Sequence, residues 1–130
     1  MENLHHQKTF RGKVFSSPEV DQIPVRQNLS VYQKKSGICF YPKTLNVRLD
    51  TDFETPKSVI HINKDELQTK EYRTGITLVP ATFRSDRIFL ICPDYPTHKP
   101  NIIEIVASFN MWRKFNIMDD DYIEFEVESD

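Results

Sequence analysis

Alternation of apolar and polar residues predicts the most regular strand of the chain. In the segment TLNVRLD, residues 44–50, three aliphatic residues fall on one face, while Thr44, Asn46 and Arg48 fall on the other. Side chains of a strand point alternately to its two faces, so this segment predicts a half-buried strand. YIEFEVE, residues 122–128, repeats the pattern with glutamates on its polar face and predicts the last strand.

Other segments rich in β-branched and aromatic residues predict further strands. They span residues 9–16, 59–62, 74–83, 87–92 and 102–107. Pro80 has no amide hydrogen to donate, so its position inside such a segment predicts an edge or a bulge. Glu104 interrupts an otherwise apolar strand, and a carboxylate in that position requires a partner or a function.

The remaining segments predict one short helix and two irregular stretches. NMWRKFN, residues 110–116, is typical of a short helix with Asn110 as its N-cap. The polar stretch from Pro18 to Gln33 predicts a long loop that ends in a short strand. Residues 1–8 predict a flexible terminus, which leaves residues 9–130 as one domain. Because closure removes exposed strand edges, many short strands with one helix favour a mostly β fold, a closed or nearly closed barrel.

Composition narrows the class of protein. The chain has 130 residues, the usual size of one domain, and 12% aromatic residues that can fill a core. A net charge of -2 provides no general attraction for a phosphate backbone, so we expect no nucleic-acid partner. The start lacks an apolar secretory segment, and the longest apolar run, Ile88 to Cys92, is too short to span a bilayer. We therefore expect a cytoplasmic protein with free thiols and no membrane partner.

Two polar residues suggest a metal site. Thr44 and Asn46 stand two apart at the start of a strand, so their side-chain oxygens point the same way. Neutral oxygens suit Mg²⁺, which takes few protein ligands and fills its other positions with water and phosphates. The alternative is that both side chains satisfy backbone groups beside a turn. The acidic run Asp119 to Asp121 predicts a solvated turn rather than a cation site, because three consecutive carboxylates cannot face one ion.

The run YPKTLNVRLD resembles a motif of the CTP-dependent, archaeal-type riboflavin kinases, in which Y-x-G-T-L-N-L holds magnesium through its Thr and Asn. Residues 101–127 resemble that family's closing segment: a strand with an internal Glu, a short helix, an F-N-L phrase, an acidic turn and a last strand. The similarity extends from about Arg11 onward. It implies a six-stranded cradle-loop barrel that transfers a phosphoryl group from CTP to riboflavin, giving FMN.

The resemblance also implies metal and flavin ligands. Carried over by position, Thr44 and Asn46 would bind magnesium. Glu104 falls where the family places a glutamate on the flavin, although a salt-bridged or edge carboxylate is the alternative. The family's flavin-binding Thr falls at Pro96 or, with a shift of one residue, at Thr97.

The resemblance places the cytidine nucleotide, CTP or CDP, at a further group of residues. The family's nucleotide-contacting segment coincides with Phe109, Asn110, Met111 and Trp112. For the two aromatic residues, packing at the barrel end is the alternative. Lys43 stands where the family has a glycine before the Thr, and it would either bind phosphate or fill the site.

One family feature is absent from the sequence. After its first strand the family has a G-x-G-x-G loop whose amides approach the nucleotide phosphates. Here the run is SSPEVDQ, residues 16–22, with a proline and two acids. In a divergent kinase, Lys13, Arg26, Lys43 and magnesium would replace those amides. The alternative is a catalytically inactive relative that serves as a flavin-, nucleotide- or protein-binding module.

Overall fold

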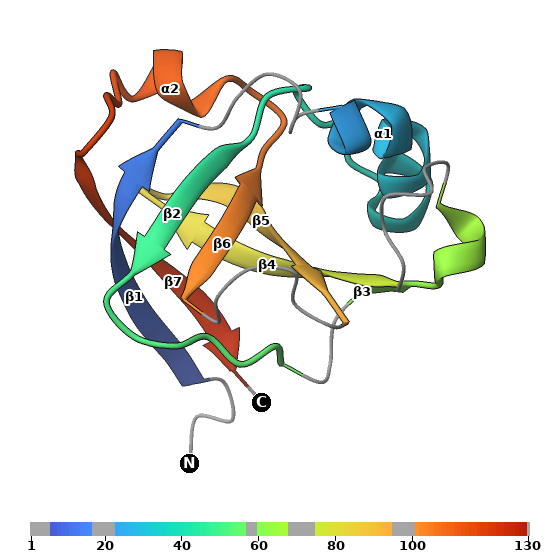
Figure 1. Cartoon of the computed structure of the whole chain (residues 1–130), viewed down its shortest axis with the longest axis horizontal. Coiled ribbons are helices and arrows are strands. Elements are labelled where there is room, and N and C mark those ends of the chain that lie inside the picture. The colour runs from blue at the N-terminus through green and yellow to red at the C-terminus, as the bar shows by residue number, and fades with distance from the viewer. Residues whose placement is uncertain (1–5, 17–22, 57–59, 68–74, 95–100, 130) are drawn as a thin grey trace.

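The computed structural model describes residues 6–16, 23–56, 60–67, 75–94 and 101–129. Their strands form one antiparallel sheet in the order β3-β4-β5-β6-β2-β1-β7, and a pairing of β4 with β7 closes six of these strands into a barrel (Figure 1). The strands are β1 (His6–Phe15), β2 (Leu45–Leu49), β3 (Ile60–Ile62), β4 (Ile76–Phe83), β5 (Asp86–Pro93), β6 (Ile102–Val106) and β7 (Tyr122–Ser129). The helical elements are α1 (Ile23–Ser36), the 3-10 turn η2 (Lys64–Glu66) and α2 (Met111–Lys114). The predicted mostly β, six-stranded barrel with one short helix before the last strand is confirmed.

Alternate residues of the barrel strands fill its interior. The buried cluster includes Val47 of β2, Leu90 of β5 and Phe125 of β7. β1 and β2 approach closely at Gly12, where an added Cβ would lie 2.5 Å from the backbone oxygen of Arg48. Only a residue without a side chain fits there, because the contact is with backbone that cannot yield.

Pro80 occupies a local edge of β4, as predicted. Ile76–Leu78 pair with β3, and Ala81 and Thr82 pair with β7. Pro80 stands between these two groups and pairs with Phe89 of β5 on its other side. The missing amide hydrogen therefore falls where β4 changes partners.

The prediction of a loop and short strand over Pro18 to Gln33 was wrong, because most of this stretch belongs to α1. The helix buries Asn28, Val31 and Tyr32, which are spaced three and four residues apart on one face. A polar residue at the first of these core positions hid the helical period from the sequence. Residues 18–22 lie outside the described part of the chain.

The end of α1 carries a stop signal in its sequence. Gly37 has a φ of 76°, and its amide donates to the Gln33 carbonyl oxygen at 2.7 Å. A glycine in the left-handed region directly after a helix is a common helix stop. The helix therefore ends directly before a glycine, which adopts this conformation without strain.

α1 creates a second apolar cluster on the outer face of the sheet. This cluster joins residues of α1 to residues of β3, β4, β5 and β6, so this part of the sheet is buried on both faces. The cluster consists of Val31, Tyr32, Phe40, Ile62, Ile76, Leu78, Phe89, Ile91 and Val106. Figure 1 shows α1 on the side of β3, away from β1 and β7.

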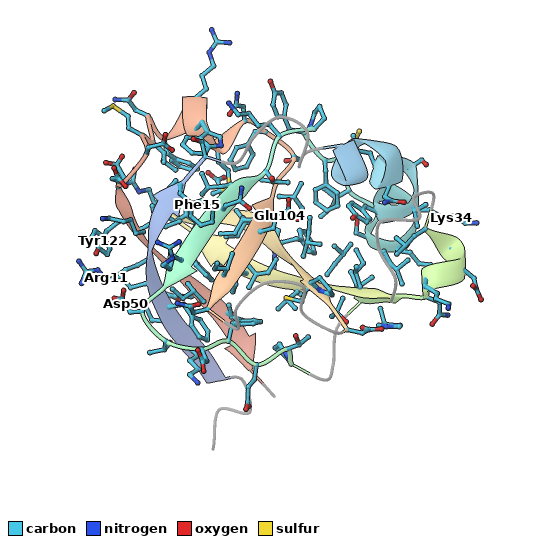
Figure 2. The ribbon with its side chains drawn as sticks, in the orientation of Figure 1. Arg11, Phe15, Lys34, Asp50, Glu104 and Tyr122 are labelled. Atoms are coloured by element: carbon cyan, nitrogen blue, oxygen red, sulfur yellow. The ribbon has the colours of Figure 1, made fainter. Side chains whose placement is uncertain are left out.

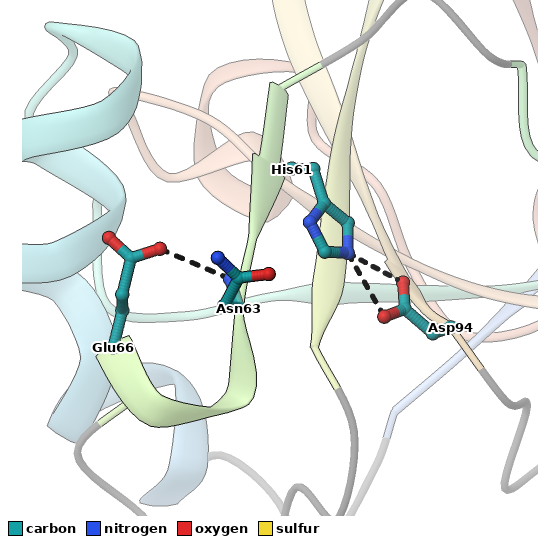
Figure 3. A network of polar contacts seen from close by, with 4 residues as sticks. All are labelled: His61, Asn63, Glu66 and Asp94. Carbon is teal, nitrogen blue, oxygen red and sulfur yellow. Dashed lines mark hydrogen bonds and ion pairs between the residues drawn. The ribbon is translucent and has the colours of Figure 1, made fainter.

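Polar contacts fasten the edge of this covered region. Lys35 Nζ, in the last turn of α1, lies 2.6 Å from Glu66 Oε2 on η2. Glu66 also accepts a hydrogen bond from the Asn63 amide at 3.2 Å, and these two contacts lower the pKa of its carboxyl group. His61 Nε2 lies 3.0 Å from both carboxylate oxygens of Asp94 (Figure 3). The end of β5 is thereby tied to β3.

Three further predictions concern the start of the first strand, the two cysteines and membrane-spanning segments. β1 begins at His6 rather than at residue 9, because its first residues pair with the end of β7. Cys39 is exposed, Cys92 is buried, and both are free. Burial raises the pKa of the Cys92 thiol to about 12, although a hydrogen bond with Thr55 opposes the shift. No helix within the described ranges is long and apolar enough to cross a membrane.

Candidate functional site

One row of side chains crosses neighbouring strands on the outer face of the barrel. Phe15 of β1 is paired with Asn46 of β2, and Asn46 is paired with Glu104 of β6. Glu104 is in turn paired with Ile91 of β5. Because Val47 faces the barrel interior, its neighbour Asn46 and the row to which it belongs face outward. Figure 2 labels Phe15 at the end of β1 nearer α2 and Glu104 midway along β6. The row places an aromatic ring, an amide, a carboxylate and an aliphatic side chain in sequence.

Thr44 joins this row from the start of β2. Its side chain is 1% exposed, and its Oγ1 donates to Glu104 Oε2 at 3.1 Å across a separation of 60 residues. Its carbonyl oxygen accepts a hydrogen bond from Trp112 Nε1 at 3.1 Å. The structure thus brings Thr44, Asn46 and Glu104 together, and the carboxylate that interrupts an apolar strand lies beside a buried hydroxyl group.

The residues of this site fit a magnesium ion. The Thr44 hydroxyl group uses its hydrogen toward Glu104, so its oxygen keeps lone pairs for a ligand. Asn46 is 8% exposed, and its buried Nδ2 has no hydrogen-bond partner among the described residues. Leaving this buried N–H donor unpaired costs about 1–3 kcal/mol, which an acceptor beside the ion, such as a phosphate or water oxygen, would recover, while the Asn46 Oδ1 faces the ion. Together with the neighbouring carboxylate, these groups form the oxygen-rich set that Mg²⁺ prefers.

The predicted nucleotide segment lies around the start of α2. Asn110 caps this helix, accepting a hydrogen bond from the Arg113 amide at 3.3 Å. The Met111 side chain is buried in the barrel core. Phe109 and Trp112 are half-buried and pack against the same core. The packing that was the alternative for the two aromatic residues is therefore present, and contacts from Met111 to a ligand are restricted to its backbone.

Lys43 lies at the same end of the barrel. Its Nζ is 5.4 Å from the Trp112 ring centroid, and it immediately precedes Thr44. The cation therefore rests on an aromatic ring beside the candidate metal ligands. Thr97 and the Arg26 side chain lie outside the residues whose positions are described.

The acidic turn is solvated, as predicted. Its three exposed carboxylates face three different partners. Asp119 Oδ2 accepts from Ser16 Oγ at 2.9 Å, and Asp121 Oδ2 accepts from the Met118 amide at 2.8 Å. Asp120 Oδ1 lies 4.0 Å from Lys13 Nζ. No group of three or more His, Cys, Asp or Glu side chains in the described ranges gathers as a metal site.

Arg48 was missed as a site residue. It lies on the outer face of β2, and its guanidinium carbon is 5.5 Å from the Phe15 ring centroid. The alternation that grouped Thr44 with Asn46 also places Arg48 on the same face. That pattern could have identified it, but its approach to Phe15 depends on how β1 pairs with β2.

Comparisons with known proteins identify the family to which the chain is similar. Residues 24–127 match the family model of the CTP-dependent riboflavin kinases, described as "Domain of unknown function DUF120". The chain is 30% identical over 123 residues to a riboflavin kinase of Staphylothermus marinus, covering 90% of this chain and 89% of that protein. It is 33% identical over 100 residues to a riboflavin kinase of Methanocella arvoryzae, covering 75% of this chain but 45% of that protein. A riboflavin kinase of Methanococcus vannielii is 30% identical over 109 residues, with 80% and 78% covered.

Proposed function

This chain belongs to the CTP-dependent riboflavin kinase family, and we propose that it transfers a phosphoryl group from CTP to riboflavin, giving FMN. The observation that carries the proposal is the meeting of Thr44, Asn46 and Glu104 on one outer face of the barrel. These are the residues that correspond to the family's magnesium and flavin ligands. Phosphoryl transfer depends chiefly on positioning and electrostatics, so it requires no side-chain nucleophile here.

In this proposal, Thr44 and Asn46 hold magnesium, which supplies positive charge to the phosphates when bound. Glu104 accepts hydrogen bonds from N–H groups of the flavin. Its carboxylate is oriented by the Thr44 hydroxyl group, so one contact links the flavin ligand to a metal ligand. Trp112 supports the same point from α2 by donating to the Thr44 backbone. Together these contacts fix Thr44 between the metal and flavin sides of the site.

The nucleotide lies at the α2 end of the barrel in this proposal. Lys43 supplies a cation next to Thr44, and residues 109–112 contact the cytidine. Lys13 contributes less positive charge to this site, since its Nζ lies within 4.0 Å of Asp120. A cytoplasmic location, expected from the sequence, remains part of the proposal.

An FMN-formation assay tests the proposal. Purified protein is supplied with riboflavin, magnesium and each of CTP, ATP, GTP and UTP in turn. We expect turnover with CTP, and we expect the double variant Thr44→Ala plus Asn46→Ala to reduce it at least about a hundredfold, since both ligands of the charge-neutralising ion are lost. Thr82→Ala, on the outer face of β4, is the matched control and should retain wild-type turnover.

A second candidate is an inactive relative that binds flavin, nucleotide or a protein. It is favoured by residues 16–22, where a proline and two acids replace the glycines whose amides would contact phosphate. Riboflavin fluorescence distinguishes the two candidates. Flavin binding without turnover from any of the four donors would support the binding module and exclude the kinase.

A further inference from the structure

Arg48 occupies the row of side chains next to the candidate site. It is paired with Lys13 of β1 on one side and with Ile102 of β6 on the other. Asn46 is two residues earlier on β2, so the two side chains leave the same face of the strand one row apart. Arg48 is therefore the exposed cation on β2 next to the amide proposed to hold magnesium.

The Arg48 side chain contacts the row to which that amide belongs. Its guanidinium lies over Phe15, and Phe15 belongs to the row of Asn46 rather than to the row of Arg48. Lys13, directly opposite Arg48, leans the other way. Its Nζ lies 5.9 Å from the Tyr122 ring centroid and 4.0 Å from Asp120. Of this cross-strand pair, Arg48 contacts the row of Phe15 and Asn46, whereas Lys13 contacts residues on the β7 side of β1.

Among the described residues, no acidic side chain lies at ion-pair distance from Arg48. Within the described residues, exposed lysines pair with acids at Lys13–Asp120, Lys35–Glu66 and Lys114–Asp86, and no such pair includes Arg48. The residue directly opposite it on β1 is another cation, and like charges in that relation destabilise a sheet. An anion bound at Arg48 would remove this repulsion.

The contact that holds Arg48 is weak enough to exchange. An exposed stack of a guanidinium on an aromatic ring contributes about 0.5–1 kcal/mol. The planar guanidinium offers paired donors that match two oxygens of a phosphate, and such charge-assisted contacts are stronger. A phosphate placed beside Asn46 would therefore compete successfully with the Phe15 ring for this side chain.

We propose that Arg48, held over Phe15, binds the phosphate group at the Thr44–Asn46 site and supplies positive charge that glycine-loop amides provide elsewhere in the family. The inference rests on the proposed function and adds a phosphate ligand to it. The bound group is a phosphate ester, either of the nucleotide or of FMN. Both present the same oxygens to a guanidinium, so separate binding measurements are required to identify the source.

Arg48→Gln tests the inference, with Arg11→Gln as the matched control. Arg11 lies on the same outer face, and its guanidinium stacks on Tyr122 at 4.6 Å, so the control removes a similar stack away from the site. Dissociation constants are measured for riboflavin and FMN by flavin fluorescence, and for CTP by calorimetry, each with magnesium. Arg48→Lys is the second variant, which keeps the charge and loses the paired donors.

We expect Arg48→Gln to raise the dissociation constant of FMN or of CTP at least about tenfold. The dissociation constant of riboflavin should change less than twofold, since riboflavin lacks the phosphate. Weakened FMN identifies the product phosphate, and weakened CTP identifies the nucleotide. Arg48→Lys should give an intermediate loss, and Arg11→Gln should give none. Unchanged FMN and CTP affinities in Arg48→Gln would overturn the inference alone. A wild-type protein that binds neither flavin nor CTP would overturn the proposed function and this inference with it.

Discussion

The outer face of the barrel has two regions that differ in what covers them. Over β3, β4, β5 and part of β6, α1 and its following segment bury residues such as Leu78, Phe89 and Val106. Over β2, β1 and β7 most outer residues are exposed and many are charged, among them Arg48 and Glu124, although Asn46 is buried. Strands of the covered region read as nearly continuous apolar runs, because both of their faces are buried. Strands of the bare region alternate, because one face meets water.

The candidate site lies at the boundary between these regions. In the row that crosses the sheet, Ile91 belongs to the covered side, and Asn46 and Phe15 belong to the bare side. Glu104 stands between them. A substrate with an apolar ring system and a charged end would meet both kinds of surface here. Because the cluster beneath α1 reaches only as far as β6, Asn46 and Phe15 lie outside it.

The largest expected loss of stability comes from a substitution in the covered region. Phe89 is 4% exposed, and its ring packs edge-on against Phe40 at 5.3 Å. Phe89→Ala should lower the free energy of unfolding by about 3–5 kcal/mol, because it leaves a cavity beneath α1. Urea unfolding measures the change. Tyr122→Ala, on the bare face and 53% exposed, is the control and should cost less than about 1 kcal/mol. Equal losses from the two variants would contradict the comparison.

A smaller effect is expected from a substitution that tests whether the bare region tolerates changes only on its outer face. Gly12→Ala forces a Cβ against the backbone of Arg48, and overpacking of this kind costs about 1–3 kcal/mol. Thermal unfolding followed by circular dichroism measures the loss. Gly37→Ala is the control, since no atom beyond its chain neighbours lies within 4 Å of the added Cβ and only the left-handed backbone opposes it, at about 1–2 kcal/mol. A Gly12 variant as stable as wild type would mean that β1 and β2 can separate freely.

The smallest effect concerns the fastening of α1 at the edge of the covered region. The pKa of Glu66 is lowered by Lys35 and by the Asn63 amide, so the carboxylate stabilises the fold above its unfolded-state pKa. This contribution is lost as pH falls through the lowered, folded-state pKa. We expect Glu66→Gln to be slightly less stable than wild type near neutral pH and to match it in acid. Melting temperatures of both proteins across this pH range provide the measurement; a constant difference at every pH would show that the ion pair contributes nothing to stability.

Strands were predictable from the sequence because each has a local signal. The alternation in β2 and β7 and the apolar runs of β4 and β5 fixed these elements to within a few residues. α1 was not predictable in this way, since its buried face includes the polar residue Asn28 and its stability comes from packing against the sheet.

The site was predictable in part for a related reason. Alternation placed Thr44 and Asn46 on one face, but pairing Asn46 with Glu104 required the register of β2 and β6. A slip of one residue would have turned Glu104 to the barrel interior. The lean of Arg48 toward Phe15 likewise depends on the register between β1 and β2. Contacts between strands that are distant in sequence therefore could not be predicted from the pattern of apolar and polar residues in one sequence.

The pairing of β1 with β7 has a practical consequence for attaching other molecules. His6 lies opposite Ser129, so both ends of the described barrel leave from one pole. Phe15 is at the other end of β1, and the rise per residue of a strand places it roughly 30 Å from His6. A fluorophore, surface tether or fused domain joined at either end would therefore stand clear of the Thr44–Asn46–Glu104 face, and the protein could be immobilised by both ends with that face open to solution.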